Sequence, residues 1–374
     1  MITEPLGIYV HIPFCKSKCR YCDFVSFKNA QKEYEQRYVN ALISEACEYS
    51  RSEKIKADTV FFGGGTPSVL SEDSFAKIAL ALKDVFDFSD NTEFTIEANP
   101  KTLTKEKLSV YRELGVNRIS LGLQTSIEKE LKILGRIHNF EDFLSSYNLC
   151  LDSGIKNINV DLMYAVPYQT VDSFFETLKR VIEINPKHIS AYSLILEEGT
   201  PLFLEKEKLT FPTEDEECHM YYTAAEILSL SGYCHYEISN YAKPGYECRH
   251  NLKYWRDKEY VGLGLAAHSY FDKKRYSNPN LFSEYFSPDK KKYITVEEIG
   301  VQENAYEYAM LGLRLSEGIS LSEYEKRFNK SFFEGREEAI ERLISANYIK
   351  VSCGRIFLTE AGFYVSNAIL SQLL

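Results

Sequence analysis

The order of segments along this chain of 374 residues constrains its fold more than any single motif does. An apolar, β-branched run recurs, followed each time by a polar or glycine-rich turn and an amphipathic helical stretch. Because the chain must cross back before each new strand, this alternation specifies parallel strands with crossover helices. The sequence therefore predicts an α/β fold, either an open doubly wound sheet or a partial barrel. The predicted strands cover residues 6–11, 59–62, 93–97, 118–123, 158–162 and 188–194.

Three glycines indicate where predicted helices end. Gly115, Gly154 and Gly232 each follow a helical segment and precede a new extended run. Helices commonly close with a residue in the left-handed conformation, which glycine adopts without a steric penalty. We expect positive φ angles at all three positions.

The polar residues that stand out fall near the carboxyl ends of the predicted strands, where both architectures place their chemistry. A cysteine-containing loop follows the first strand, and three glycines at 63–65 follow the second. Glycines let a ligand approach the backbone closely, because no Cβ stands in the way. We expect one site that combines these turns with the polar side chains of the later strands, namely Glu97, Gln124, Asp161 and Tyr192.

Cys15, Cys19 and Cys22 place three thiols within eight residues. Soft thiolates select zinc, copper(I) or iron–sulfur clusters over hard cations. Three ligands are one too few for a closed four-thiolate cage, so a cubic iron–sulfur cluster would keep one iron open as a reaction site. A Cys3His zinc site that uses His11 or another histidine also has suitable ligand types. A disulfide with a spare thiol fits less well, because nine cysteines are an odd number and no secretory signal is evident.

Charge and the start of the sequence bear on partners and location. A formal net charge of −10 opposes attraction to phosphate backbones, so nucleic acid is not an expected partner. The first residues lack a basic region, and no apolar run approaches the length that crosses a bilayer, so no transmembrane segment is expected. We expect a cytoplasmic protein.

Beyond these patterns, the chain resembles a known family. The C-x3-C-x2-C spacing of the three cysteines resembles the signature of the radical S-adenosylmethionine (SAM) proteins. Within that superfamily the chain is similar to the oxygen-independent coproporphyrinogen III oxidase group, through residues 9–15 (YVHIPFC), 63–67 (GGGTP), 96–100 (IEANP) and 159–163 (NVDLM). The HNxxYW segment at 250–255 resembles the heme-chaperone branch of that group. The likeness covers nearly the whole chain and implies a partial (βα)6 TIM-like barrel.

The resemblance also implies roles for individual residues. Cys15, Cys19 and Cys22 would bind a [4Fe-4S] cluster, and the amino and carboxylate groups of SAM would chelate the open iron. The positions that would line the SAM pocket are Tyr9, Tyr21, Gly64, Gly65, Thr66 and Glu97. Three further positions match those that bind a second SAM in the oxidase relatives, and in a chaperone they are open to another ligand; these are Gln124, Arg136 and Asp161.

Two of these residues have their own physical arguments. The planar fork of Arg136 suits a carboxylate, either of SAM or of a porphyrin propionate, while the simpler alternative is a solvated helix residue. With the resemblance to the heme-chaperone branch, we favour His250 as the axial ligand of heme, with Trp255 nearby as an aromatic wall. The alternative is that His250 caps a turn and that Cys234 and Cys248 are small buried hydrophobes.

Two departures separate the chain from the decarboxylating oxidases. Those relatives carry a fourth cysteine in C-x3-C-x2-C-x-C, where this chain has Phe24. They also have an N-terminal extension over the reaction chamber, whereas the first predicted strand here begins by about residue 6. We therefore expect a heme chaperone that passes heme to an acceptor protein, with an electron donor required if SAM is cleaved. The alternatives are a coproporphyrinogen III dehydrogenase and a zinc-stabilised binding module.

The sequence predicts a core over residues 1–271, a polar, lysine-rich surface linker over 272–300, and a winged-helix-like α+β unit over 301–374. The last unit has helical spacing at 302–315, 321–329 and 332–347, then a hairpin at 348–357 around Gly354. The helix that would enter a DNA groove carries four glutamates against two arginines, which makes phosphate contact unfavourable. We expect this unit to be a cap or a partner surface.

Overall fold

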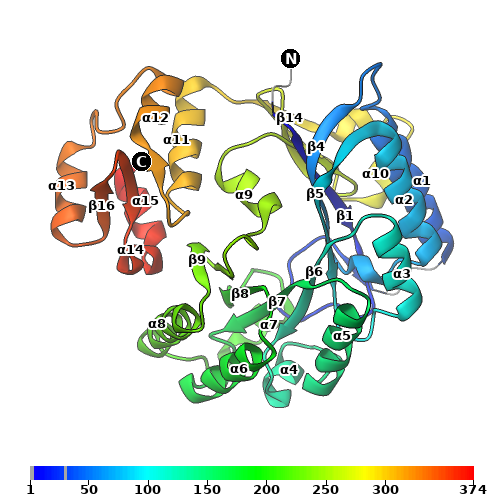
Figure 1. The fold of residues 1–374 in the computed structure, drawn as a ribbon, viewed down its shortest axis with the longest axis horizontal. Helices are drawn as coiled ribbons and strands as arrows, with labels where there is room; N and C mark the ends of the chain where they lie inside the picture. Colours follow the sequence, from blue (N-terminus) through cyan, green and yellow to red (C-terminus); the bar gives the residue numbers. More distant parts are fainter. Residues whose placement is uncertain (1–3, 29–31) are drawn as a thin grey trace.

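The computed structural model describes residues 4–28 and 32–374. Its centre is a run of parallel strands that pair in chain order, with the crossover helices on the outer face (Figure 1). These strands are β1 (Leu6–Ile12), β4 (Ile55–Gly64), β5 (Phe86–Ala98), β6 (Arg118–Gln124), β7 (Asn157–Tyr164) and β8 (His188–Ser193). All six coincide with predicted strands, so the partial barrel is confirmed.

The helices that cover the barrel are amphipathic and bury one face against the strands. They are α1 (Lys32–Cys47), α2 (Glu72–Val85), α3 (Lys105–Glu113), α4 (Glu128–Ile133), α5 (Phe140–Asp152), α6 (Val171–Ile184) and α8 (Glu214–Leu230). Their starts have side-chain caps where the sequence offers one; Thr104, for example, accepts a hydrogen bond from the Lys107 amide at the start of α3. Gly115, Gly154 and Gly232 have φ angles of 96°, 93° and 79°, which confirms the predicted left-handed helix ends.

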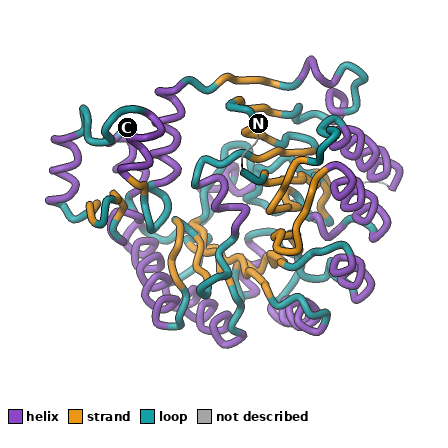
Figure 2. The backbone as a smooth tube through the Cα atoms, turned by 45° about the horizontal axis from the view of Figure 1, so that its top comes forward, coloured by secondary structure: helices purple, strands orange, loops and turns teal. Residues whose placement is uncertain are grey.

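Further strands extend the sheet at both edges, so that twelve strands of the described chain form one curved layer (Figure 2). Next to β1 come β11 (Tyr260–Leu263), which is parallel to it, and then β12 (His268–Phe271), β13 (Lys274–Ser277) and β14 (Thr295–Glu298), which are antiparallel. Next to β8 lie β10 (Asn240–Ala242) and β9 (Cys234–Glu237).

The segment predicted as a linker, residues 272–300, is therefore folded and not a plain surface connection. It contains β13 and β14 and, between them, α10 (Phe282–Tyr285) and the 3-10 turn η3 (Lys290–Tyr293). Every side chain of β14 is exposed and those of β13 are half-buried. Strands at the edge of a sheet keep polar side chains in water, which explains why their composition resembles that of a loop.

A short helix, α9 (Arg249–Trp255), lies inside the curve of the sheet (Figure 1). Its first-turn amides at Arg249 and His250 both donate to the Glu93 carboxylate, each at 3.0 Å. Because Glu93 pairs with Thr59 early in the parallel register, α9 closes the amino ends of the strands. The opposite, carboxyl ends carry the cysteine loop.

The C-terminal unit follows the predicted order of helices and hairpin. It contains α11 (Val301–Gly312), β15 (Ile319–Ser320), α12 (Leu321–Phe328), α13 (Glu337–Ser345), β16 (Ile349–Ser352), β17 (Arg355–Leu358), α14 (Glu360–Tyr364) and α15 (Ser366–Leu373). The turn of the hairpin falls at Cys353 and Gly354, which have φ angles of 50° and 72°. Smaller elements complete the chain: β2 (Phe14–Cys15), β3 (Phe27–Lys28), α7 (Pro201–Leu204), and the 3-10 turns η1 (Pro67–Val69) and η2 (Lys206–Lys208).

Candidate functional site

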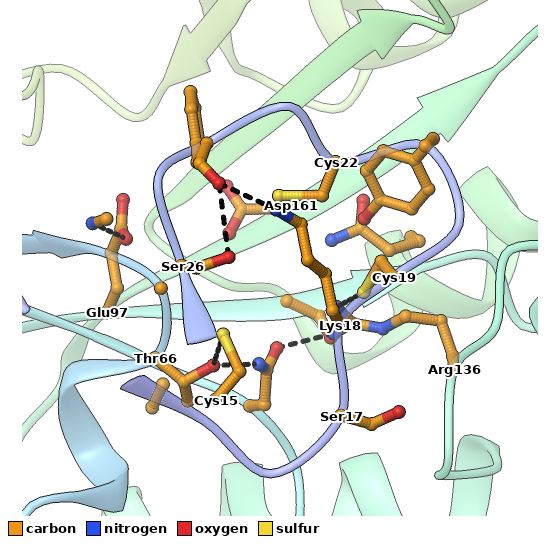
Figure 3. Close-up of a pocket in the computed structure, with 18 of the residues that line it drawn as sticks. Cys15, Ser17, Lys18, Cys19, Cys22, Ser26, Thr66, Glu97, Arg136 and Asp161 are labelled. Carbon is orange, nitrogen blue, oxygen red and sulfur yellow. Dashed lines mark hydrogen bonds between the residues drawn. The ribbon is translucent and has the colours of Figure 1, made fainter. Parts of the chain in front are cut away.

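A cavity of about 390 Å³ opens at the carboxyl ends of the parallel strands, between them and the cysteine loop (Figure 3). It brings together residues from β4, β5, β6 and β7 with the loop that follows β1. Of the residues singled out in the sequence, those that line it are Cys15, Cys19, Cys22, Tyr21, Gly64, Gly65, Thr66, Glu97, Gln124, Arg136, Asp161 and Tyr192.

The cysteine loop is held at its centre by Arg20. The Arg20 amide donates to the Leu134 carbonyl at 3.0 Å, and the Leu202 amide donates to the Arg20 carbonyl at 2.9 Å. The Arg20 guanidinium also pairs with Glu205 at 2.6 Å. These contacts fix the loop against segments from the far side of the barrel, and so they hold the three thiols on one wall of the cavity.

The sulfur atoms themselves receive hydrogen bonds from the barrel. The Thr66 hydroxyl donates to Cys15 Sγ at 3.6 Å, and Arg136 Nη1 donates to Cys19 Sγ at 3.3 Å. Burial raises the pKa of the Cys15 and Cys22 thiols, so these groups hold their protons more tightly until a metal replaces them. Three thiols with donors aimed at two of the sulfurs fit the ligands of an iron–sulfur cluster.

The zinc alternative requires a fourth ligand, and His11 is already engaged. Its Nε2 donates to the Val25 carbonyl at 2.9 Å, and its Nδ1 accepts from the Tyr9 hydroxyl at 3.0 Å. In the described part of the chain, no three His, Cys, Asp or Glu side chains are arranged as ligands of one metal ion. The cysteines of a cubane bind separate irons and do not need that arrangement.

Glycines let the strand β4 pass directly behind the cysteine loop. A Cβ at Gly65 would lie 2.8 Å from the Phe14 carbonyl and 3.0 Å from Cys15 Sγ. Gly64 has a φ angle of 106°, which disfavours other residues, and its amide donates to Glu97 at 3.2 Å. The triple glycine is therefore required by the close approach of the protein's own backbone and side chains, whereas the approach of a ligand stays a prediction.

Two half-buried acids lie together at the cavity. Burial and, to a smaller extent, the nearby Asp161 together raise the pKa of Glu97 to about 8. Burial also raises the pKa of Asp161, although Ser120 and Asn159 donate to its carboxylate at 3.1 and 2.7 Å. A cationic ligand would relieve both acids, because a positive charge favours their ionised form.

Arg136 is not the solvated helix residue of the simpler interpretation. It follows α4 in a loop, and its side chain points into the cavity (Figure 3). Its Nη2 donates to Asn99 Oδ1 at 2.5 Å and to the Gly122 carbonyl at 2.6 Å. Gln124 lines the same wall with a φ angle of 74°, a left-handed conformation at the end of β6.

Two predicted residues lie elsewhere. Tyr9 sits one layer deeper, where it contacts His11, and a Cβ on Gly63 would lie only 3.0 Å from its ring. His250 is 1% exposed and belongs to α9, with its two ring nitrogens 2.8 Å from the hydroxyls of Thr59 and Tyr254. To bind heme iron, His250 would first have to give up one of these hydrogen bonds.

The structure also adds residues that the sequence argument did not assign. Asn99, Ser120 and Met163 line the cavity, and so does Phe24, which is 59% exposed. In the sequence, Asn99 enters only as part of the IEANP match at 96–100. Its distance of two residues from Glu97, which places both at the end of the same strand, was the available signal.

Comparison with known proteins agrees with this geometry. Residues 9–181 match the profile of the Radical SAM superfamily, and residues 301–365 match that of the HemN C-terminal domain. The heme chaperone HemW of Lactococcus lactis is 35% identical over 379 residues, which cover 100% of this chain and 98% of the relative. That of Haemophilus influenzae is 34% identical over 385 residues, with 99% and 98% covered.

A solved structure shares the fold over almost the full length. Coproporphyrinogen III oxidase (HemN) from Escherichia coli, described as a radical SAM enzyme, has a TM-score of 0.86 at 22% identity, with 99% of this chain and 90% of the other covered. At that identity the likeness concerns the fold alone. The long matches at 34% and 35% identity carry the assignment instead. This chain belongs to the radical SAM superfamily and, within it, to the HemW family.

Proposed function

We propose that this protein is a heme chaperone, which binds heme and transfers it to an acceptor protein, on a barrel that carries a [4Fe-4S] cluster and SAM. The observation that carries the proposal is the single cavity that unites three cysteines with the glycines and acids of the barrel. HemW relatives that match this chain from end to end support the heme-carrying role.

Membership of the radical SAM superfamily implies the cluster and SAM as cofactors. Cys15, Cys19 and Cys22 would hold the cluster, whose fourth iron stays open for SAM. When bound, the cluster supplies an electron for reductive cleavage of SAM, and we propose a separate protein as the electron donor. Within this chain, Thr66 and Arg136 orient the sulfur atoms, and Gly64 and Gly65 leave room beside them.

The acids at the cavity suit the positive charges of SAM. Glu97 is buried beside Asp161, so its carboxylate gains most from a sulfonium or ammonium group placed between them. A carboxylate also accepts the two hydroxyls of a ribose. We propose that Glu97 binds SAM and that Tyr21 and Gln124 complete the wall around it.

Heme would then lie at the mouth of the cavity. Phe24 and Tyr192 both line the cavity and are 59% and 37% exposed, so their rings offer faces to a flat macrocycle. Lys18 lies at the same edge and could pair with a propionate. An Arg136 already committed to Cys19, Asn99 and Gly122 is a weaker candidate for that pairing.

The test is anaerobic reconstitution with iron and sulfide, followed by three measurements on the same preparation. We expect heme binding, seen as a Soret band, and transfer of that heme to apomyoglobin as a generic acceptor. We expect no conversion of coproporphyrinogen III. The release of 5′-deoxyadenosine from SAM, measured in parallel, reports whether SAM is cleaved.

The matched control is Cys218→Ala, which removes a cysteine outside the cavity, compared with Cys19→Ala within it. Loss of the cluster in the Cys19 variant alone supports the assignment of the ligands. Turnover of coproporphyrinogen III, or a colourless wild-type protein that contains zinc, would overturn the proposal.

We further propose a cytoplasmic location. Exposed thiols at Cys47, Cys234 and Cys353 support it, because an oxidising compartment would couple or oxidise them. In the described ranges, no helix has both the length and the apolar character to span a bilayer.

A further inference from the structure

An unbroken run of hydrogen bonds joins two of the three cysteine sulfurs (Figure 3). From one end, Cys15 Sγ accepts from the Thr66 hydroxyl at 3.6 Å, and Thr66 Oγ1 accepts from Asn99 Nδ2 at 2.9 Å. From the other end, Cys19 Sγ accepts from Arg136 Nη1 at 3.3 Å, while Arg136 Nη2 donates to Asn99 Oδ1 at 2.5 Å. Asn99 is the midpoint of this run.

The amide of Asn99 determines which way both halves point. Its NH2 group donates to Thr66, so the single proton of the Thr66 hydroxyl is left for Cys15 Sγ. Its oxygen holds one Arg136 nitrogen, and the rigid guanidinium then directs the other toward Cys19. Turned by 180°, the amide would face its NH2 toward the guanidinium and draw the Thr66 proton away from the sulfur.

Gly122 leaves the space in which this arrangement forms. A Cβ at position 122 would lie 2.9 Å from both Arg136 Nη2 and Asn99 Oδ1. Its carbonyl also accepts from Arg136 Nη2 at 2.6 Å, which fixes the guanidinium from a second side. The residues around the Arg136 guanidinium and the Asn99 amide therefore come from the ends of three neighbouring strands. Thr66 follows β4, Asn99 follows β5, and Gly122 belongs to β6.

We infer that Asn99 is a positioning residue that seats the cluster and raises its reduction potential, by aiming a hydrogen-bond donor at the sulfur of Cys15 and another at that of Cys19. The physical reason is charge. A reduced cluster carries one more negative charge than the oxidised one, and donors to its thiolate sulfurs stabilise that charge. The inference rests on the proposed [4Fe-4S] cofactor.

The experiment measures the midpoint potential of the anaerobically reconstituted cluster, by redox titration followed by electron paramagnetic resonance. Asn99→Ala removes the hydrogen bonds of this side chain to Thr66 and Arg136. We expect the cluster of this variant to have a more negative midpoint potential than that of the wild type. In Asn99→Asp the carboxylate still accepts from Arg136 but draws the Thr66 proton to itself. We expect a negative shift there too, with the added charge acting in the same direction.

The matched control is Asn117→Ala. Like Asn99, Asn117 bridges two groups with its amide, but these are backbone groups, the Phe94 amide at 3.0 Å and the Thr92 carbonyl at 2.8 Å. Asn117 lies at the amino ends of the strands, away from the cavity. We expect this variant to keep the wild-type potential even where its stability falls. Gly122→Ala, which displaces the Arg136–Asn99 pair, should reproduce the negative shift.

The outcomes separate this inference from the proposed function. A wild-type protein that forms no [4Fe-4S] cluster removes the proposed cofactor. A wild-type cluster, together with unchanged potentials and iron content in Asn99→Ala and Gly122→Ala, overturns the role of Asn99 alone. A cluster lost from Asn99→Ala but retained in Asn117→Ala, at equal helical content by circular dichroism, supports the seating role.

Discussion

At the scale of single residues, the protonation of Glu97 ties the cavity to the stability of the fold. In the unfolded chain this carboxyl ionises near pH 4.5, but in the ligand-free folded protein its pKa is about 8. Between these values the folded state binds more protons than the unfolded state. The free energy of unfolding therefore falls as pH rises through this window.

Glu97→Gln should remove this slope. We expect the ligand-free variant to gain stability relative to the wild type between pH 5 and pH 8, by at most about 1.4 kcal/mol per pH unit. Urea unfolding at both pH values measures the difference. Glu106→Gln is the control, because its exposed carboxyl has a lowered pKa and is ionised throughout this range. A wild-type slope that persists in Glu97→Gln would place the titrating group elsewhere.

The residues at the strand ends were predictable, whereas the layer beneath them was not. Gly64 is the last residue of β4 and Glu97 is the last but one of β5, so the motif and the topology agree on their place. Tyr9 comes three residues before the end of β1, on the same face as His11, and so it lies deeper in the barrel. A motif match does not tell how far a residue lies from the end of its strand, and for this reason it did not reveal that Tyr9 lies outside the cavity lining.

At the scale of elements, α9 closes the amino ends of the barrel strands, and its side chains are engaged in packing contacts. His250 stacks on Phe61 with ring centroids 5.3 Å apart, and Lys253 pairs with Asp58 at 2.7 Å. Gly7 on β1 makes room for this helix, since a Cβ there would lie 3.3 Å from the His250 ring. The HNxxYW segment thus has a role in packing, and heme binding by His250 stays a prediction.

His250→Ala should therefore destabilise the protein, by about 2–4 kcal/mol, because it removes two buried hydrogen bonds and a packed ring. We expect the heme affinity of the folded fraction and its Soret band to stay unchanged. Chemical unfolding and heme titration measure the two effects separately. His219→Ala, an exposed histidine on α8, is the control and should change neither. A shifted Soret band in His250→Ala would restore this residue as the axial ligand.

The elements that alternate along the chain were found from the sequence because their periodicity is strong. Those that extend the sheet were not found, since β9 to β14 are only three or four residues long. Their pairing depends on the backbone of a neighbouring strand rather than on their own composition. The same reason explains why residues 272–300 were predicted as a linker.

At the scale of the whole molecule, an ion pair with a buried aspartate joins the C-terminal unit to the barrel. Arg327 on α12 contacts Asp257, whose side chain is 1% exposed and also accepts from Asn304 at 2.8 Å. Burial raises the pKa of Asp257, while Arg327 acts to lower it. An exposed pair between Arg256 and Glu317 spans the same junction at 3.0 Å.

Removal of the two arginines should have different effects. Arg327→Ala leaves the Asp257 charge buried without its partner, and we expect a loss of about 3–5 kcal/mol. Arg256→Ala breaks an exposed pair and should cost less than about 1 kcal/mol. Thermal unfolding followed by calorimetry compares the variants. Equal losses would mean that the junction does not depend on the buried charge.

The contacts of Arg20 have a consequence for the shape of the barrel. The sheet order places β11 beside β1 and β10 beside β8, so the first and last parallel strands are not hydrogen-bonded to each other. Between these two strands, Arg20 contacts the segment after β8. Its guanidinium pairs with Glu205, and its carbonyl accepts a hydrogen bond from the Leu202 amide. A partly exposed ion pair and one backbone hydrogen bond are each worth only about 1 kcal/mol. These two weak contacts therefore set the distance between the cysteine loop and the segment after β8, and a bulky ligand can break them without disturbing the strands.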